Sequence, residues 1–401
     1  MDSLIVNQKE YKITQEDRQK CFIEDKENSR ILFIFDHATW GQIQPVESAY
    51  VCGSFNSWQE NEDFKMHYSP ELNLHYLAVD FSKVSIIGNS GYPEYKFCIN
   101  HEFIWLQGIN FIPPGYAFFS SDRNLVIVHE GEDLSEVIKE SNIGETIKSL
   151  SDFDLNTREG QEEISNFRLV PGTKKLFRCF HPFYSTGGRS NRYETEKTRI
   201  ELVQKLCEEE GIKSDINLTD DYTIYAGEDI HWYDGTSGKV TIPDFYQKML
   251  DSNSVCNVMS ASEVVPYYDY VYTKPRGELF GEWVQNVVYF IIDDAHEAPF
   301  SIHCAIGTDR TGVFSALLGG LCGATWNEVA EDYQKTNRMG INEYRSKALL
   351  AQAFQNLLQT EDVSKIPDFQ KALWDYFTTT PLHGKPILTE EEIRKIILKL
   401  D

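Results

Sequence analysis

The chain has 401 residues, with 38 Lys and Arg against 62 Asp and Glu, and its formal net charge is −24. This length suffices for more than one hydrophobic core, and 41% hydrophobic with 25% charged residues argues against a wholly disordered or fibrous chain. The acidic surface repels nucleic acid backbones and anionic lipid headgroups, so nucleic acid is not an expected partner.

Targeting and metal-binding signals are missing from the sequence. The first twenty residues contain no basic segment followed by an apolar core, and no run approaches the length of a membrane span. The eight cysteines include no CxxC pair, which argues against a zinc ribbon and against a secreted disulfide framework. We therefore expect a cytoplasmic protein with no signal peptide, no membrane span, no metal and no cofactor.

The N-terminal part of the chain reads as a β-sandwich. Short β-prone runs such as ILFIFDHA, SAYVCGSF and NLVIVH alternate with turn residues from position 31 to about 129. The following stretch is rich in Asp, Glu, Ser and Lys, which favours a solvated linker. We predict an N-terminal segment at 1–30, an all-β, immunoglobulin-like sandwich at 31–130 and an acidic linker at 131–165.

From residue 166 to residue 401, helical patterns alternate with short apolar strands, which predicts an α/β domain with a central sheet flanked by helices. The run YETEKTRIELVQKLCEEEGIK predicts an amphipathic helix that ends at Gly211. ELFGEWVQNVVYFIID predicts a second helix, and PFSIHC a short buried strand. Capping-box spacing at Thr325 and again at Thr389 predicts the starts of two further helices.

The segment from Phe300 to Gly312, FSIHCAIGTDRTG, predicts a strand, a loop and a helix. The N–H groups of such a loop point inward in front of the positive end of the helix dipole, so the loop is expected to bind an anion. Cys304 begins this loop and Arg310 ends it. The donors that bind a phosphate would also stabilise a thiolate at Cys304 and lower its pKa. Gly307 allows the tight turn that the loop requires.

This segment reads His-Cys-x5-Arg-Thr-Gly and resembles the motif of the cysteine-dependent protein tyrosine and dual-specificity phosphatase superfamily. The similarity is closest to the HCxxGxDRTG branch of bacterial and fungal tyrosine and phosphoinositide phosphatases. Thr308 stands where that branch usually carries Lys. Without this cation, attraction for highly charged inositol polyphosphates is expected to be weaker.

The resemblance assigns a role to each residue of the loop. Cys304 attacks phosphorus to form a cysteinyl phosphate, Arg310 and the loop amides stabilise the equatorial oxygens, and Thr311 hydrogen-bonds the sulfur. The implied phosphate-binding residues are Ala305, Ile306, Gly307, Thr308, Asp309, Arg310 and Thr311.

The leaving group also needs a proton, which this superfamily takes from an Asp on an upstream loop. Asp234, in Trp-Tyr-Asp-Gly, is the first candidate, and Asp244 and Asp309 are the others. The alternative for Asp234 is an ordinary Asp-Gly turn residue. The segment Ile216–Thr219 reads Ile-Asn-Leu-Thr where the branch tends to read Ile-Asp-Leu-Arg, so the rim of the site departs from the branch.

Two runs of the N-terminal part, VCGSFNSW and YKFCIN, resemble the glycogen-binding module of the AMP-activated kinase β subunit. A glucan site needs flat aromatic faces and a few polar groups, and the resemblance implies Trp58, Lys96, Trp105 and Asn124. The alternative is that both Trp residues pack in the core or against the second domain.

We therefore predict a phosphatase that acts on a phosphorylated protein or a small-molecule phosphomonoester, with phosphotyrosine as the first substrate class. Two alternatives stay open. One is a phosphoglucan or phosphoinositide phosphatase, with the sandwich holding a glucan in the first case. The other is a phosphate- or glycan-binding scaffold that does not turn over.

Overall fold

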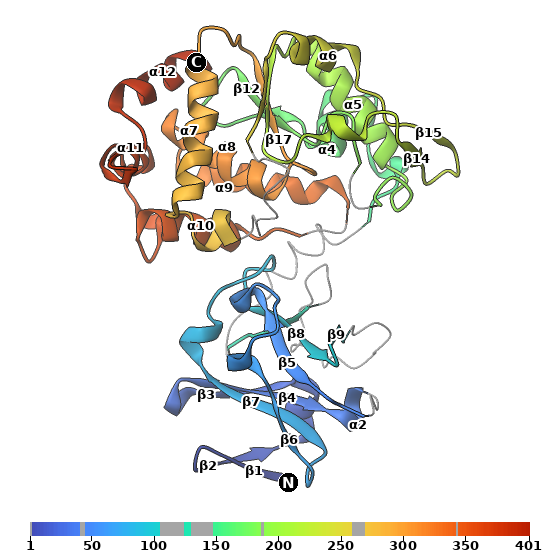
Figure 1. Ribbon diagram of the computed structural model, residues 1–401, viewed down its shortest axis with the longest axis vertical. Helices are drawn as coiled ribbons and strands as arrows, with labels where there is room; N and C mark the ends of the chain where they lie inside the picture. The colour runs from blue at the N-terminus through green and yellow to red at the C-terminus, as the bar shows by residue number, and fades with distance from the viewer. Residues whose placement is uncertain are drawn as a thin grey trace. The chain divides into compact units, whose positions relative to one another are not determined.

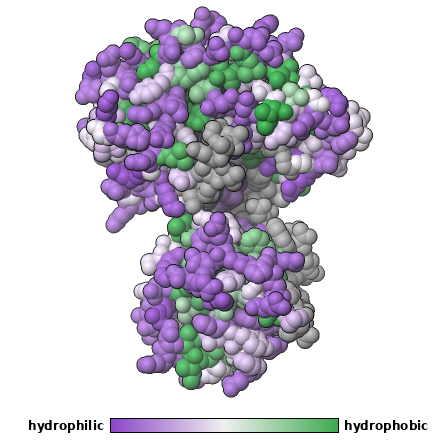
Figure 2. Space-filling model, in the orientation of Figure 1, coloured by the Kyte–Doolittle hydropathy of each residue, from purple (hydrophilic) through white to green (hydrophobic). Residues whose placement is uncertain are grey.

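The computed structural model describes residues 2–40, 45–104, 124–129, 147–185, 188–258, 269–341 and 344–401. The chain divides into two units, Met1–Asn142 and Ile143–Asp401 (Figure 1). The first is rich in strands and the second alternates helices and strands, as the sequence predicts. The visible face of each unit is largely hydrophilic, in keeping with the net charge of −24 (Figure 2).

Two antiparallel sheets make up most of the first unit. One has the order β3 (Phe22–Asp25), β4 (Arg30–Asp36), β7 (Leu74–Asp80), β6 (His67–Ser69). The other has the order β10 (Leu125–Val126), β8 (Glu94–Ile99), β5 (Ala49–Gly53), with β9 (Glu102–Phe103) on β8. The remaining elements are β1 (Asp2–Val6), β2 (Lys9–Ile13), α1 (Gln15–Lys20) and α2 (His37–Trp40).

The two sheets pack face to face through aromatic side chains. The ring centroids of Phe33 on β4 and Tyr95 on β8 lie 4.8 Å apart, and those of Phe35 and Phe97 lie 5.1 Å apart. All four side chains are buried, so the unit is a β-sandwich with an aromatic core.

Strand β4 is apolar on both faces, and the segment before it explains why. Leu32 and Ile34 point away from the sandwich core and pack with Leu4, Tyr11 and Ile13 of the β1–β2 hairpin. Strand β3 also pairs with β4. The described sandwich therefore begins before residue 31, and part of the predicted N-terminal segment at 1–30 belongs to it.

The second unit is built on a five-stranded mixed sheet. Its order is β11 (Arg168–Leu169), β12 (Leu176–Cys179), β17 (Phe300–His303), β13 (Ser214–Asn217), β16 (Val255–Asn257). The β12–β17, β17–β13 and β13–β16 pairs are parallel, and β11 runs antiparallel to β12. Parallel strands need crossover connections, and the helices supply them.

Helices cover both faces of this sheet (Figure 1). On one face of the sheet, Leu176, Ile216 and Ile302 pack with helices α7–α12. On the opposite face, Phe177 and Cys179 pack with helices α5 and α6. The helices are α4 (Arg158–Ser165), α5 (Glu196–Glu209), α6 (Asp244–Asp251), α7 (Glu278–Ile292), α8 (Asp309–Leu321), α9 (Trp326–Lys335), α10 (Lys347–Leu358), α11 (Phe369–Thr379) and α12 (Glu390–Leu400). Two hairpins lie outside the sheet: β14 (Asp229–His231) with β15 (Ser237–Lys239), and β18 (Pro381–Leu382) with β19 (Lys385–Pro386).

Local signals in the sequence locate several of these elements. The predicted capping boxes at Thr325 and Thr389 are present at the starts of α9 and α12. The structure differs from the prediction at the end of the acidic linker. Within 131–165, residues 158–165 form α4, whose buried Ile164 and packing against α5 place it in the second unit. No helix among the described residues is long and apolar enough to cross a membrane.

A buried histidine pair in the first unit predicts a pH dependence. Nε2 of His37 and Nδ1 of His75 lie 2.8 Å apart, and burial lowers the pKa of His37 and lowers that of His75 to about 4. Because an unfolded His takes up a proton near pH 6.5, the first unit is expected to lose stability as the pH falls from 7 to 5.

Replacement of His75 by Gln should reduce this pH dependence by about 1 kcal/mol, measured by calorimetry of the full chain. The exposed His67→Gln variant is the matched control on the neighbouring strand. An unchanged pH dependence in His75→Gln would contradict a buried neutral pair.

Candidate functional site

The loop from Cys304 to Thr308 joins β17 to α8 at the centre of the sheet. Strands β12 and β13 flank β17 on either side and run parallel to it, so the carboxyl ends of all three meet at one edge. Ligand sites of open α/β sheets lie at this edge.

The carbonyl group of Gly307 is held by donors outside the loop. Arg178 Nη2 donates to it over 2.8 Å and Asn166 Nδ2 over 2.9 Å. Gly307 has φ +74°, and a Cβ there would lie 2.2 Å from the carbonyl oxygen of Cys179. Only glycine fits at this position, and its carbonyl is bound by donors from outside the loop.

Arg178 is itself fully buried and paired with an acid. Its Nη1 donates to Asp332 over 2.7 Å, and Arg168 Nε donates to the same carboxylate over 2.5 Å. Burial raises the pKa of Asp332, but the charges of the two arginines outweigh burial and lower it below the ordinary value. Asp332 is therefore an anion that keeps Arg178 in place beneath the loop.

A second buried pair fixes the end of the loop. Arg345 donates from Nε and Nη2 to the two oxygens of Asp309 over 2.7 and 3.0 Å, and Tyr272 donates its hydroxyl over 2.8 Å. Thr308 adds a bond of 3.1 Å. Burial raises the pKa of Asp309, but these partners, led by Arg345, bring it below the ordinary value. Asp309, a candidate proton donor in the sequence, thus lies in the structure as an engaged anion at the first turn of α8.

His303 anchors the start of the loop. Its Nε2 lies 2.9 Å from Asp215 on β13, and its Nδ1 lies 3.2 Å from the carbonyl oxygen of Cys304. Burial lowers the pKa of His303, but Asp215 outweighs burial and raises it above the ordinary value. The Cys304 carbonyl is thus a second loop carbonyl that has a partner outside the loop. Tyr246 supports Asp215 with a bond of 3.0 Å.

The Cys304 thiol has the electrostatics of a nucleophile. Burial raises its pKa, but the charge of Arg310, together with the neighbouring Thr311, brings it below the ordinary value. Burial has the opposite result where a carboxylate rather than a cation lies nearby, since burial and an aspartate raise the pKa values of Cys256 and Cys322 to about 12. Cys304 therefore lies where a thiolate is stabilised.

The other predicted proton donors lie on exposed parts of the second unit. Asp234 occupies the turn between β14 and β15, where its carboxylate accepts from the Thr236 amide and hydroxyl over 2.9 and 2.5 Å. These bonds lower the pKa of Asp234. Asp244 is exposed at the first residue of α6. No hydrogen bond or ion pair among the described residues joins either carboxylate to the Cys304–Arg310 loop.

The predicted glucan positions do not form an open platform in the described residues. The Lys96 ammonium lies over the rings of half-buried Trp58 and of Phe103, at 5.6 and 5.9 Å. Asn124 is only 3% exposed, and its amide donates to buried Glu94 over 2.7 Å. Its assignment to a glucan site stays a prediction. Trp105 lies outside the described residues.

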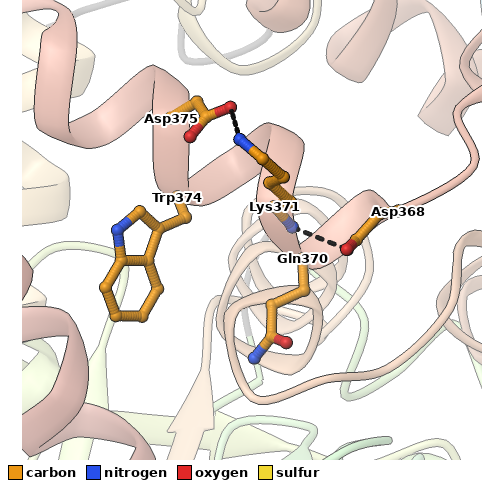
Figure 3. A pocket seen from close by; sticks show the side chains of 5 residues that line it. All are labelled: Asp368, Gln370, Lys371, Trp374 and Asp375. Carbon is orange, nitrogen blue, oxygen red and sulfur yellow. Dashed lines mark hydrogen bonds and ion pairs between the residues drawn. The ribbon is translucent and has the colours of Figure 1, made fainter.

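A separate hollow of about 370 Å³ lies along α11 (Figure 3). Lys371 is paired there with Asp375 and donates its backbone N–H to Asp368 over 2.8 Å, which caps the helix. Gln370 donates to the Leu321 carbonyl over 2.7 Å. These side chains are thus engaged in holding α11, and the hollow contains no residue of the Cys304–Arg310 loop.

Sequence reasoning missed most of the residues that support the loop. Asp215, Asp332 and Arg345 are buried charges far from Cys304 in the sequence. Only Asp215 leaves a signal, as a lone acid inside a short buried strand. Among the described residues, no group of three or more His, Cys, Asp or Glu is arranged to hold a metal ion.

Comparison with known proteins assigns the part of the chain around this loop. Residues 236–380 match a family model described as the tyrosine phosphatase family. The match includes β17, the loop and α8, and it confirms the predicted membership of this part in the protein tyrosine phosphatase superfamily. No curated protein matches the chain.

The close packing around Gly307 gives a direct test of the loop. Gly307→Ala should abolish binding of tungstate, a phosphate mimic, because the new Cβ clashes with the Cys179 carbonyl. The strained φ adds about 1–3 kcal/mol of destabilisation. Titration calorimetry and thermal unfolding of the full chain measure both effects.

The matched control is Gly211→Ala, at φ +63° with nothing within 4 Å of the added Cβ. It should lose about 1 kcal/mol of stability and bind tungstate normally. Wild-type tungstate affinity in Gly307→Ala would contradict the assigned loop geometry.

Proposed function

We propose that the tyrosine phosphatase domain is a cysteine-dependent phosphomonoesterase with Cys304 as its nucleophile. The observation that carries this proposal is the place of the buried Cys304 at the head of the loop between β17 and α8, where the charge of Arg310 lowers its pKa. The bound carbonyls of Cys304 and Gly307 support it, because they leave the loop amides free for the oxygens of a phosphoryl group.

In the proposed reaction, a phosphomonoester dianion binds with its nonbridging oxygens against the loop amides and the Arg310 guanidinium. The Cys304 thiolate attacks phosphorus, and the P–O bond to the leaving group breaks as the S–P bond forms. A water molecule then attacks the cysteinyl phosphate, releasing inorganic phosphate and the thiolate. Thr311 stabilises the thiolate at the start and at the end of the cycle.

Aromatic residues beside the loop favour aryl phosphates, of which phosphotyrosine is the natural example. Burial is the main cause that raises the pKa of Tyr222, and the charges of Arg310 and Cys304 also act on it. The Tyr222 phenol therefore lies near the loop. Tyr184 packs edge-on against Tyr222 at 5.1 Å and stacks on Tyr225 at 4.6 Å. Such faces suit the ring of an aryl substrate.

Other substrate classes have less support. A phosphoinositide would find Thr308 at the position where the related branch carries a cation. A glucan would find the ring of Trp58 next to the Lys96 ammonium. A cytoplasmic location is proposed because the chain contains eight free cysteines, which suit a reducing compartment. A binding scaffold without turnover is the alternative if hydrolysis fails.

Hydrolysis of p-nitrophenyl phosphate in EDTA tests the proposal. Cys304→Ser should lose essentially all turnover, and Arg310→Lys should lower kcat by about 100-fold or more, since a point charge replaces a planar fork. Cys256→Ser, at a half-buried thiol on β16, should retain wild-type activity. Undiminished activity in Cys304→Ser, or none in the wild type, would refute the proposal.

A further inference from the structure

Expulsion of an alkoxide or phenoxide from the phosphorus requires a proton, and the donor must lie at the same edge of the sheet as Cys304. We infer that Asp220 is this general acid, an assignment that rests on the proposed phosphatase function. It names a residue that sequence motifs do not single out.

The backbone brings Asp220 to the carboxyl edge beside the loop. In the parallel β13–β17 pair, Asn217 lies opposite His303, and the Leu218 amide donates to the His303 carbonyl over 2.8 Å. The chain therefore leaves β13 alongside Cys304, and Asp220 follows two residues later.

A side chain fixes the turn that carries Asp220. Asn217 Nδ2 donates to the backbone carbonyl of Asp220 over 2.9 Å, and lies 2.8 Å from Asn257 Oδ1 at the end of β16. The turn is thus tied to two adjacent strands of the sheet, so Asp220 is held at this edge. Asn217 stands where the related branch usually carries Asp.

Tyr222 links Asp220 to the reacting groups. This phenol is 8% exposed and accepts a bond of 3.2 Å from the Thr219 hydroxyl. The charges of Asp220, Cys304 and Arg310 all act on it. Because charges are screened beyond about 10 Å, the three groups lie in the neighbourhood of this one side chain.

Asp220 is also available to carry a proton. It is half-buried, and its carboxylate makes no hydrogen bond or ion pair within the described part of the chain. The neighbouring carboxylates are engaged: Asp215 with His303, Asp221 with Thr223, Asp234 with Thr236 and Asp309 with Arg345. Their oxygens are occupied by protein partners, whereas those of Asp220 are open to a leaving group.

The proton transfer from Asp220 needs no reactant other than the phosphomonoester and water. The Asp220 carboxyl transfers its proton to the bridging oxygen as the P–O bond breaks, and the leaving group departs as a neutral alcohol or phenol. The Asp220 carboxylate then accepts a proton from the water that attacks the cysteinyl phosphate. That transfer restores the acid for the next cycle.

Leaving-group dependence in the full chain tests this assignment. Asp220→Asn should lower kcat/KM by about 100-fold or more for phenyl phosphate, whose leaving group needs a proton. It should lower kcat/KM by less than about 10-fold for p-nitrophenyl phosphate, whose phenolate is stable by itself. The loss of activity at high pH that reports the protonated acid should disappear in the variant.

Asp221→Asn is the matched control, since the same change is made one residue away and the Asn oxygen can still cap Thr223. It should show the wild-type dependence on leaving group. Asp220→Glu should recover part of the phenyl phosphate activity. Tungstate affinity and thermal unfolding establish that Asp220→Asn keeps the loop intact.

The outcomes separate the two proposals. No Cys304-dependent turnover of p-nitrophenyl phosphate in the wild type would overturn both. Turnover with an unchanged leaving-group dependence in Asp220→Asn would overturn the Asp220 assignment alone. The Asp220 assignment would also be overturned if Asp234→Asn, at the candidate favoured by sequence, produced the leaving-group effect instead. It would likewise be overturned if Asp220→Asn lost tungstate binding along with its activity.

Discussion

The direction of two carbonyl groups decides whether the loop can hold an anion. A short turn between a strand and a helix has N–H and C=O groups in equal supply, and an anion is bound only if the carbonyls face away. The oxygens of Cys304 and Gly307 do so because buried donors bind them from behind. The lowered pKa of Cys304 has a separate cause, which is the charge of Arg310 at the other end of the loop.

These donors are charged, and burying them requires balancing anions. Arg178 is matched by Asp332, and His303 by Asp215, with each member nearly inaccessible to solvent. Removing one member of such a pair leaves an uncompensated buried charge, at a cost of about 3–5 kcal/mol. The pairs are thus better understood as fixing the loop geometry than as adding net stability.

Local charge matching also explains how an acidic chain could hold the anion of the proposed reaction. The net charge of −24 would repel a phosphomonoester at long range. Around the loop, Asp215, Asp309 and Asp332 each face a cation, so their charges are neutralised nearby. The charge of Asp309 still raises the pKa of Cys304, but the charge of Arg310 outweighs it.

Sequence was informative where the chemistry is local. The strand, loop and helix around Cys304 and the capping boxes at Thr325 and Thr389 follow from neighbouring residues, and the structure has them. Support from Arg345 and Asn166 was not predictable, because each meets the loop only after the whole sheet has formed. The bond from the Asn124 amide to Glu94 was likewise not predictable, because it joins residues 30 positions apart.

Rapid acid quench of the full chain during turnover of an aryl phosphate, followed by peptide mass mapping, tests the central claim most directly. The account predicts one phosphate on the peptide that contains Cys304, and none in Cys304→Ser. Steady hydrolysis with no phosphate on Cys304 at any quench time, or with phosphate on a different residue, would contradict it.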